Sequence, residues 1–187
     1  DIVIASETGQ YLLTSSSGYV PQLLSATPST WVIVSDIDNN GQEDIVFGPM
    51  GISGTTINVY RNGGYSADDD INIIGCDTPE VLLLDEDIYP ELVCPYSEGS
   101  PSTIFWGSGQ GWSTSSKREV QTSSKSFISV GYLRHSSERA FVLSPEESAS
   151  TSCVVENLSN PSDLCSEEVS LIQMNGKPQI WGWGYGL

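Results

Sequence analysis

Positive charge is scarce in this sequence. Its 187 residues include 7 Lys and Arg against 24 Asp and Glu, which gives a formal net charge of −17. A chain with this surplus of acid repels phosphate backbones and anionic lipid headgroups. We therefore expect no nucleic-acid partner, and favour divalent cations, neutral glycans or basic protein surfaces. The acidity alone would also serve to keep an extracellular protein in solution.

Long hydrophobic runs are absent as well. No apolar segment approaches the roughly 20 residues that a membrane-spanning helix needs, so we expect no membrane insertion. The chain opens directly on the strand-like segment Asp1-Ile-Val-Ile-Ala5. It shows no charged leader followed by an apolar core, which favours a processed end or a start inside a longer precursor.

Groups that carry catalysis are few. The single histidine, His135, stands between Arg134 and Ser136, and no Ser or Cys nucleophile motif accompanies it. Gly-rich phosphate loops and dinucleotide fingerprints are missing too. Carboxylates are plentiful, yet no two stand out as a glycosidase pair. We predict that the chain is not an enzyme and has no catalytic residues.

Four cysteines are present, and no C-x-x-C pair occurs among them, which argues against a zinc site. Of the three possible connectivities we favour the sequential one, Cys76 with Cys94 and Cys153 with Cys165. This pairing would place the protein in an oxidising compartment, and so predicts a secreted, extracellular protein. Asn157-Leu158-Ser159 is a glycosylation sequon inside the second proposed loop, so Asn157 is a predicted glycosylation site.

Short β-branched or aromatic runs alternate with Gly, Ser, Pro, Asn and Asp clusters, and no segment keeps a helical apolar period over three turns. An all-β protein is predicted. The expected strands are Ile2–Ala5, Tyr11–Thr14, Trp31–Ser35, Ile45–Gly48, Ile57–Arg61, Ile71–Gly75, Val81–Leu84, Leu92–Pro95, Thr103–Trp106, Arg118–Gln121, Phe127–Leu133, Ala140–Leu143, Cys153–Glu156, Val169–Met174 and Ile180–Trp183.

Three of these strands precede polar loops at a constant spacing. The loops begin at Asp36, Asp85 and Arg134, so that 49 residues separate each from the next. A period of about 50 residues with about four strands per unit is typical of a β-propeller or a propeller-like array. We expect one repeat domain over residues 1–187, with units of about 1–29, 30–78, 79–126 and 127–168, and closing or exchanged strands over 169–187.

The two ends do not fill these units evenly. Asp1-Ile-Val-Ile-Ala5 matches Asp44-Ile-Val-Phe-Gly48, the strand after the first loop, so the N-terminal unit is expected to lack its first strand. Val169–Met174 is a candidate to supply that strand and close a ring. The tail Gln179–Leu187 is surplus to this closure, so either the chain is a piece of a longer array or the tail pairs with another subunit.

The segment Asp36–Asp44 has the pattern of a calcium loop. Oxygen-bearing side chains occupy positions one, three, five and nine, Gly41 supplies a turn, and a backbone carbonyl falls at position seven; the predicted ligands are Asp36, Asp38, Asn40, Gln42 and Asp44. Calcium takes six to eight such oxygens. Phe47 stands at position twelve, where an EF-hand has Glu. The alternative is an Asn-Gly hairpin turn with solvating acids.

The segment Asp36–Gly48, together with residues 56–63, resembles the FG-GAP/VCBS repeat of integrin-α-like β-propellers over about one 50-residue unit. The resemblance implies that the Asp-rich loop joins the first two strands of a blade and holds a structural Ca²⁺. The other units depart from the pattern. Asp85–Glu91 keeps two acids but is shorter and lacks the Gly, Arg134–Glu138 has lost the site altogether, and Asn175–Pro178 keeps only a turn.

These observations predict a secreted, calcium-stabilised module for binding or assembly, such as an extracellular structural or adhesion protein. Its partner would be an extracellular protein or a second copy joined through residues 179–187. The alternative is a lectin of FG-GAP type, in which Trp106 and Trp112 stack on sugar rings. Packing of Trp106 between sheets is the competing explanation for that residue.

Overall fold

The computed structural model describes residues 1–50, 56–61, 64–73, 76, 79–84, 87–95 and 101–120 with their side chains, and describes further strands between 126 and 178 by their backbone. Apart from two short 3-10 helices, η1 (Ser15–Ser17) and η2 (Ala67–Asp69), all regular elements in these ranges are β-strands. The prediction of an all-β protein is confirmed.

The strands form antiparallel sheets in which neighbours follow chain order. The first sheet contains β1 (Ile2–Ser6), β2 (Gly9–Leu13) and β3 (Gln22–Ser25). The second contains β4 (Ser29–Ser35), β5 (Asp44–Pro49), β6 (Thr56–Arg61) and β7 (Gly64–Tyr65), with β8 (Ile71–Asn72) also paired to β6. The third contains β9 (Glu80–Leu82), β10 (Glu91–Cys94), β11 (Ser102–Phe105) and β12 (Lys117–Val120).

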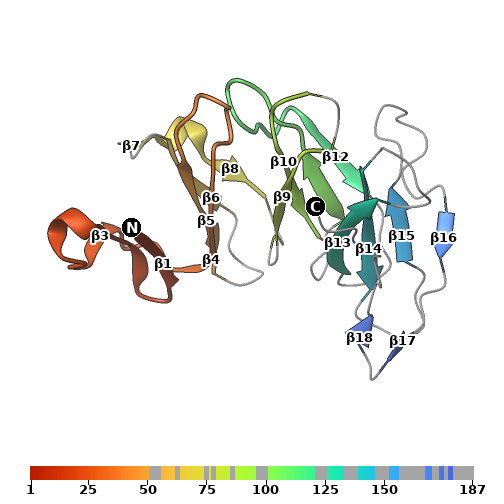
Figure 1. Cartoon of the computed structure of the whole chain (residues 1–187), viewed down its shortest axis with the longest axis horizontal. Helices are drawn as coiled ribbons and strands as arrows, with labels where there is room; N and C mark the ends of the chain where they lie inside the picture. The colour runs from red at the N-terminus through yellow and green to blue at the C-terminus, as the bar shows by residue number, and fades with distance from the viewer. Residues whose placement is uncertain are drawn as a thin grey trace.

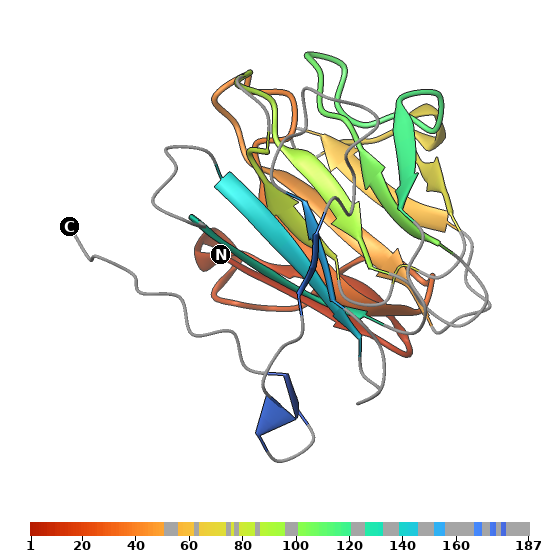
Figure 2. The same ribbon diagram turned by 90° about the vertical axis from the view of Figure 1, so that its right-hand side faces the viewer.

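The fourth sheet contains β13 (Ser126–Tyr132), β14 (Arg139–Pro145), β15 (Ser152–Val155) and β16 (Glu167–Val169), and a hairpin of β17 (Gln173–Met174) and β18 (Lys177–Pro178) follows it. The four sheets succeed one another along the long axis of the molecule (Figure 1), and a view along that axis shows them one behind another (Figure 2).

The three loops that define the 49-residue spacing each follow the first strand of a sheet, whereas the bounds of the repeat units stay a prediction. Each of the strands β4, β9 and β13 begins a four-stranded meander and precedes one of the three loops. The first sheet has three strands, and β1 stands where β5, β10 and β14 stand in the others. β1, β2 and β3 are therefore the counterparts of the second, third and fourth strands of the later sheets.

The expected closing strand Val169–Met174 differs from the structure. Val169 is the last residue of β16, which pairs with β15, whereas Gln173 and Met174 form β17, which pairs with β18. The edge of β15 is the open edge nearest in sequence, and antiparallel meanders favour such short connections. The tail Gln179–Leu187 lies outside the described residues.

The second and third sheets pack face to face around the main core. Consecutive residues are buried along β5 and β10, the pattern of strands that are covered on both faces. The buried core residues are Ile37, Val46, Ile57, Val59, Ile71, Cys76, Leu92, Cys94, Phe105 and Trp112. This core holds the ends of β4 and β5, and hence the loop between them, against the third sheet.

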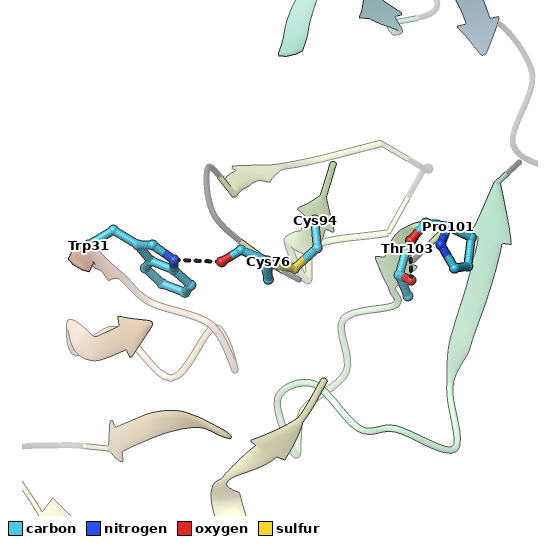
Figure 3. Close-up of a disulfide and its surroundings, with 5 residues drawn as sticks. All are labelled: Trp31, Cys76, Cys94, Pro101 and Thr103. Atoms are coloured by element: carbon cyan, nitrogen blue, oxygen red, sulfur yellow. Dashed lines mark hydrogen bonds between the residues drawn. A yellow bond between two sulfur atoms is a disulfide. The ribbon is translucent and has the colours of Figure 1, made fainter. Parts of the chain in front are cut away.

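A disulfide reinforces the same interface. Cys76, which follows β8, is bonded to Cys94 at the end of β10 (Figure 3), so this half of the predicted pairing is confirmed. The indole Nε1 of Trp31, on β4, donates to the carbonyl oxygen of Cys76 at 2.7 Å. Cys153 lies in β15 and Cys165 lies outside the described residues, so their pairing stays a prediction.

The first and second sheets meet through a buried polar group instead. Gln10, on β2, is fully buried, and its Nε2 donates to Ser29 Oγ at 2.8 Å and to Asn58 Oδ1 at 2.9 Å. The Tyr60 hydroxyl donates to Gln10 Oε1 at 2.8 Å. Because every polar atom of this amide side chain has a partner, its burial fixes the register between the two sheets.

Candidate metal centre

The loop from β4 to β5 is organised by its own side chains. Asp36 accepts hydrogen bonds from the backbone N–H of Asn40 at 3.0 Å, through Oδ1, and from that of Gly41 at 2.7 Å, through Oδ2. Asn39 and Gly41 adopt left-handed backbone conformations, with φ of 54° and 86°. Asn and Gly are the residues that tolerate this region best, so the sequence Asn39-Asn40-Gly41 allows the chain to curl around Asp36.

The curl brings three carboxylates together. Ligand oxygens of Asp36, Asp38 and Asp44 all lie within 4.8 Å of one another. Asp44 is fully buried, and its Oδ2 accepts the backbone N–H of Ile37 at 3.2 Å. Three negative charges this close repel each other, and a divalent cation bound by hard oxygens would relieve that repulsion. The donor set therefore fits a divalent cation that prefers hard oxygen ligands.

The two remaining predicted ligands are more exposed. Asn40 Oδ1 accepts the backbone N–H of Gln42 at 2.9 Å, and the N–H of Asn40 is also within 3.2 Å of Asp38 Oδ1. Such side-chain-to-backbone bonds stabilise a loop without any ion. The structure thus brings the three Asp residues together, and leaves the parts of Asn40 and Gln42 as metal ligands a prediction.

An arginine that the sequence did not single out lies beside the carboxylates. Arg61, at the end of β6, places Nη1 3.8 Å from Asp38 Oδ2 and Nε 3.3 Å from Asp69 Oδ1. Its Nη2 also donates to the carbonyl oxygen of Gln110. Arg61 therefore supplies one resident positive charge near the three acids and connects the loop to η2 and to the segment that precedes β12.

No sequence signal marked Arg61, because a lone Arg at the end of a strand is ordinary. The neighbouring glycine is a partial clue. Gly111 has φ of 74°, and a Cβ atom there would clash with the guanidinium of Arg61. The glycine is thus favoured by its backbone conformation, and a larger residue there would displace the end of the Arg61 side chain.

The loop from β9 to β10 repeats one element of this site. The N–H of Leu84 donates to Glu91 Oε2 at 2.6 Å, as that of Ile37 donates to Asp44, and both bonds span seven residues. Glu91 is fully buried. Asp85 lies outside the described residues, and in the part of the chain with described side chains only Asp36, Asp38 and Asp44 lie close enough together to hold a metal ion.

The predicted glycan-stacking residues have different environments. Trp112 is 5% exposed and belongs to the core, where its Nε1 donates to the carbonyl oxygen of Pro90 at 2.6 Å. Its ring faces are covered by protein, so the prediction that Trp112 stacks on a sugar is wrong. Trp106, just after β11, is half-buried. Trp106 keeps part of its surface free and its role stays a prediction.

Other predicted features fall where side chains are not described. Asn157, the third loop with His135, and the tail 179–187 all lie outside the described residues. Within the described ranges, no helix is both long and apolar enough to cross a membrane.

Comparison of the chain with protein-family models, with curated proteins and with solved structures finds no match in any of the three. The resemblance to FG-GAP/VCBS repeats therefore depends on the residues of the calcium-like loop and the strands around it.

Proposed function

We propose that this protein is a secreted, calcium-braced module of FG-GAP type, with propeller-like architecture, whose work is binding or assembly. The observation that carries the proposal is the approach of Asp36, Asp38 and Asp44 to within 4.8 Å of one another. The succession of four-stranded meanders supports the propeller-like arrangement, since each meander has the strand order of a propeller blade.

The ion would act as a structural brace. Asp36 follows the last residue of β4 and Asp44 is the first residue of β5, so a cation bound by both would tie the two strands at the point where they separate. Asp38 would contribute a further ligand oxygen from within the loop. Metal that binds only the folded state stabilises it by mass action, by about 2.7 kcal/mol at a concentration 100 times the Kd.

Calcium titration by calorimetry, with the thermal melting temperature measured in parallel, tests this function. We expect the wild-type chain to bind one Ca²⁺ and to melt at a higher temperature with Ca²⁺ than with a chelator. The double variant Asp36→Ala/Asp38→Ala should lose both effects. Glu119→Ala removes a carboxylate from the exposed pair with Lys117 and is the matched control. A double variant with wild-type stability in excess calcium would refute the brace.

An extracellular location agrees with the Cys76–Cys94 disulfide, because such bonds persist in oxidising compartments. Assembly through the tail is tested separately. Removal of residues 179–187 should weaken association of the chain with an extracellular protein, as measured by sedimentation. Unchanged association after this deletion would remove the tail from the proposal.

A further inference from the structure

One face of the first sheet is apolar and open. The cross-strand register pairs Ile2 with Leu13, Ile4 with Tyr11, and Tyr11 with Leu23, so these five side chains lie on one face, here called the outer face of the first sheet. Ile2, Ile4 and Leu23 are 50%, 40% and 52% exposed. Three adjacent strands thus present aliphatic and aromatic side chains to solvent together.

The corresponding face is covered in the next two sheets. By the sequence match of β1 with β5, Ile4 corresponds to Phe47, which is fully buried. Phe47 is the cross-strand partner of Asn58, and Asn58 bonds to Gln10, so the first sheet covers this face of the second. In the third sheet Leu92 is fully buried in the core that the second sheet shares.

The same contact is therefore made twice within one chain. In both contacts, the later sheet uses the face that corresponds to the outer face of the first sheet. That face packs against the opposite face of the sheet before it. The first sheet has this face too, and there Ile2, Ile4 and Leu23 remain exposed in the described part of the chain. Its apolar composition is that of an interior face, which marks an interaction site rather than ordinary surface.

The other end of the molecule carries the complementary kind of face. In the fourth sheet the register pairs Phe141 with Val155 and Leu143 with Cys153, which places these four residues at positions on one face. Phe141 stands two residues into β14, as Val46 stands in β5, where the face of Val46 packs on the following sheet. The fourth sheet lies at the end of the molecule opposite to the first (Figure 1).

We propose that a second copy of this chain docks the Phe141 face of its fourth sheet onto the outer face of the first sheet, head to tail. The contact continues the sheet-to-sheet interface already made within the chain, with the same pair of faces. Such heterologous contacts join copies into rings or open filaments according to the rotation between them. The surface is separate from the calcium loop and from the tail 179–187.

Sedimentation velocity of the full chain in Ca²⁺, over a concentration series, tests the proposal. The wild-type chain should form dimers or longer assemblies, and Ile4→Asp and Leu23→Asp should each sediment as monomers with unchanged circular dichroism. Ile88→Asp alters an apolar side chain elsewhere that is 60% exposed, and it should associate like the wild type. A wild-type monomer at the highest concentration, or association that survives Ile4→Asp, would overturn the proposal.

Mixing two variants tests the head-to-tail direction. Ile4→Asp keeps the fourth-sheet face and Phe141→Asp keeps the outer face of the first sheet, so each alone should be monomeric and the mixture should form a 1:1 dimer. Val155→Asp replaces Phe141→Asp if the latter unfolds. If the fourth-sheet variants associate alone as the wild type does, or if the mixture stays monomeric, the proposed direction is wrong. Because none of these substitutions touches Asp36, Asp38 or Asp44, calcium binding should persist in all of them.

Discussion

The backbone N–H of Leu84 donates a hydrogen bond of 2.6 Å to Oε2 of the buried Glu91, across the loop that joins β9 to β10. The preceding sheet makes the same bond, from Ile37 to Asp44, at 3.2 Å. In each case a carboxylate at the start of a second strand fixes the chain that leaves the first strand. The loop from β9 to β10 therefore keeps this hydrogen bond, although its other acidic positions differ from those of the loop from β4 to β5.

This hydrogen bond to a buried carboxylate should stabilise both the second and the third sheet, whereas calcium should stabilise only the second. We expect Glu91→Ala to lower the free energy of unfolding by about 1–3 kcal/mol, because a buried N–H loses its partner. Its response to calcium should equal that of the wild type. Asp44→Ala should lower stability and also abolish the response. Urea unfolding with and without calcium measures both, and a calcium response lost in Glu91→Ala would contradict the assignment.

Arg61 should have opposite effects on stability and on metal affinity. Arg61→Gln removes its ion pairs with Asp38 and Asp69, and we expect a loss of about 1 kcal/mol in calcium-free buffer. The same change removes a positive charge beside the proposed ion, so calcium should bind about threefold to tenfold more tightly at low salt. Calorimetric titration measures the affinity. Weaker binding in Arg61→Gln would mean that Arg61 positions Asp38 instead.

The Cys76–Cys94 disulfide should contribute strongly to stability. It closes a loop with a sequence separation of 18 residues, for which the loss of unfolded-state entropy corresponds to about 3 kcal/mol. We expect the double variant Cys76→Ala/Cys94→Ala to lose about this amount in denaturant unfolding. Reductant should then affect it less than it affects the wild type. Equal stability of the two proteins would show that the bond adds nothing to the core contacts.

Trp112 should behave as a core residue. Trp112→Ala should cost about 3–5 kcal/mol through loss of buried contacts. Trp112→Phe keeps an aromatic ring and loses the hydrogen bond to Pro90, so it should cost less, about 1–3 kcal/mol. Trp106→Ala, at a half-buried position, is the comparison. On a glycan array, any binding that depends on a tryptophan should depend on Trp106 and survive Trp112→Phe.

The hydroxyl of Tyr65 donates to Asp70 Oδ2 at 2.6 Å, and this hydrogen bond raises the pKa of Tyr65 to about 12. Folding therefore favours the neutral phenol. Its contribution to stability is fully present below pH 10, the ordinary pKa, and is lost as the pH rises through about 12. Ultraviolet titration should show Tyr65 ionising late in the wild type and earlier in Asp70→Asn, whereas Tyr60, whose pKa is raised first by burial, should still ionise late in both. An unchanged titration curve in Asp70→Asn would exclude Asp70 as the cause.

Local pattern was enough to predict most strands. The β-branched runs at Ile2–Ala5, Trp31–Ser35 and Ile57–Arg61 fall within the strands found, since side chains of this kind pack well on a pleated surface. β3 was missed because Gln22-Leu23-Leu24-Ser25 shows no clear period, and β7 because two residues carry too little signal. β3 and β7 form because they pair with the edges of β2 and β6, respectively.

The sequence by itself determined the all-β class and the acidic loop, because each depends on residues close together in the chain. It also supported the Cys76–Cys94 pairing through their short separation. Only the tertiary structure decided that Trp112 is buried, that Gln10 joins two sheets, that Arg61 lies beside Asp38, and that one apolar face stays open. Each of these depends on which sheets meet and through which faces, and residues far apart in sequence decide that.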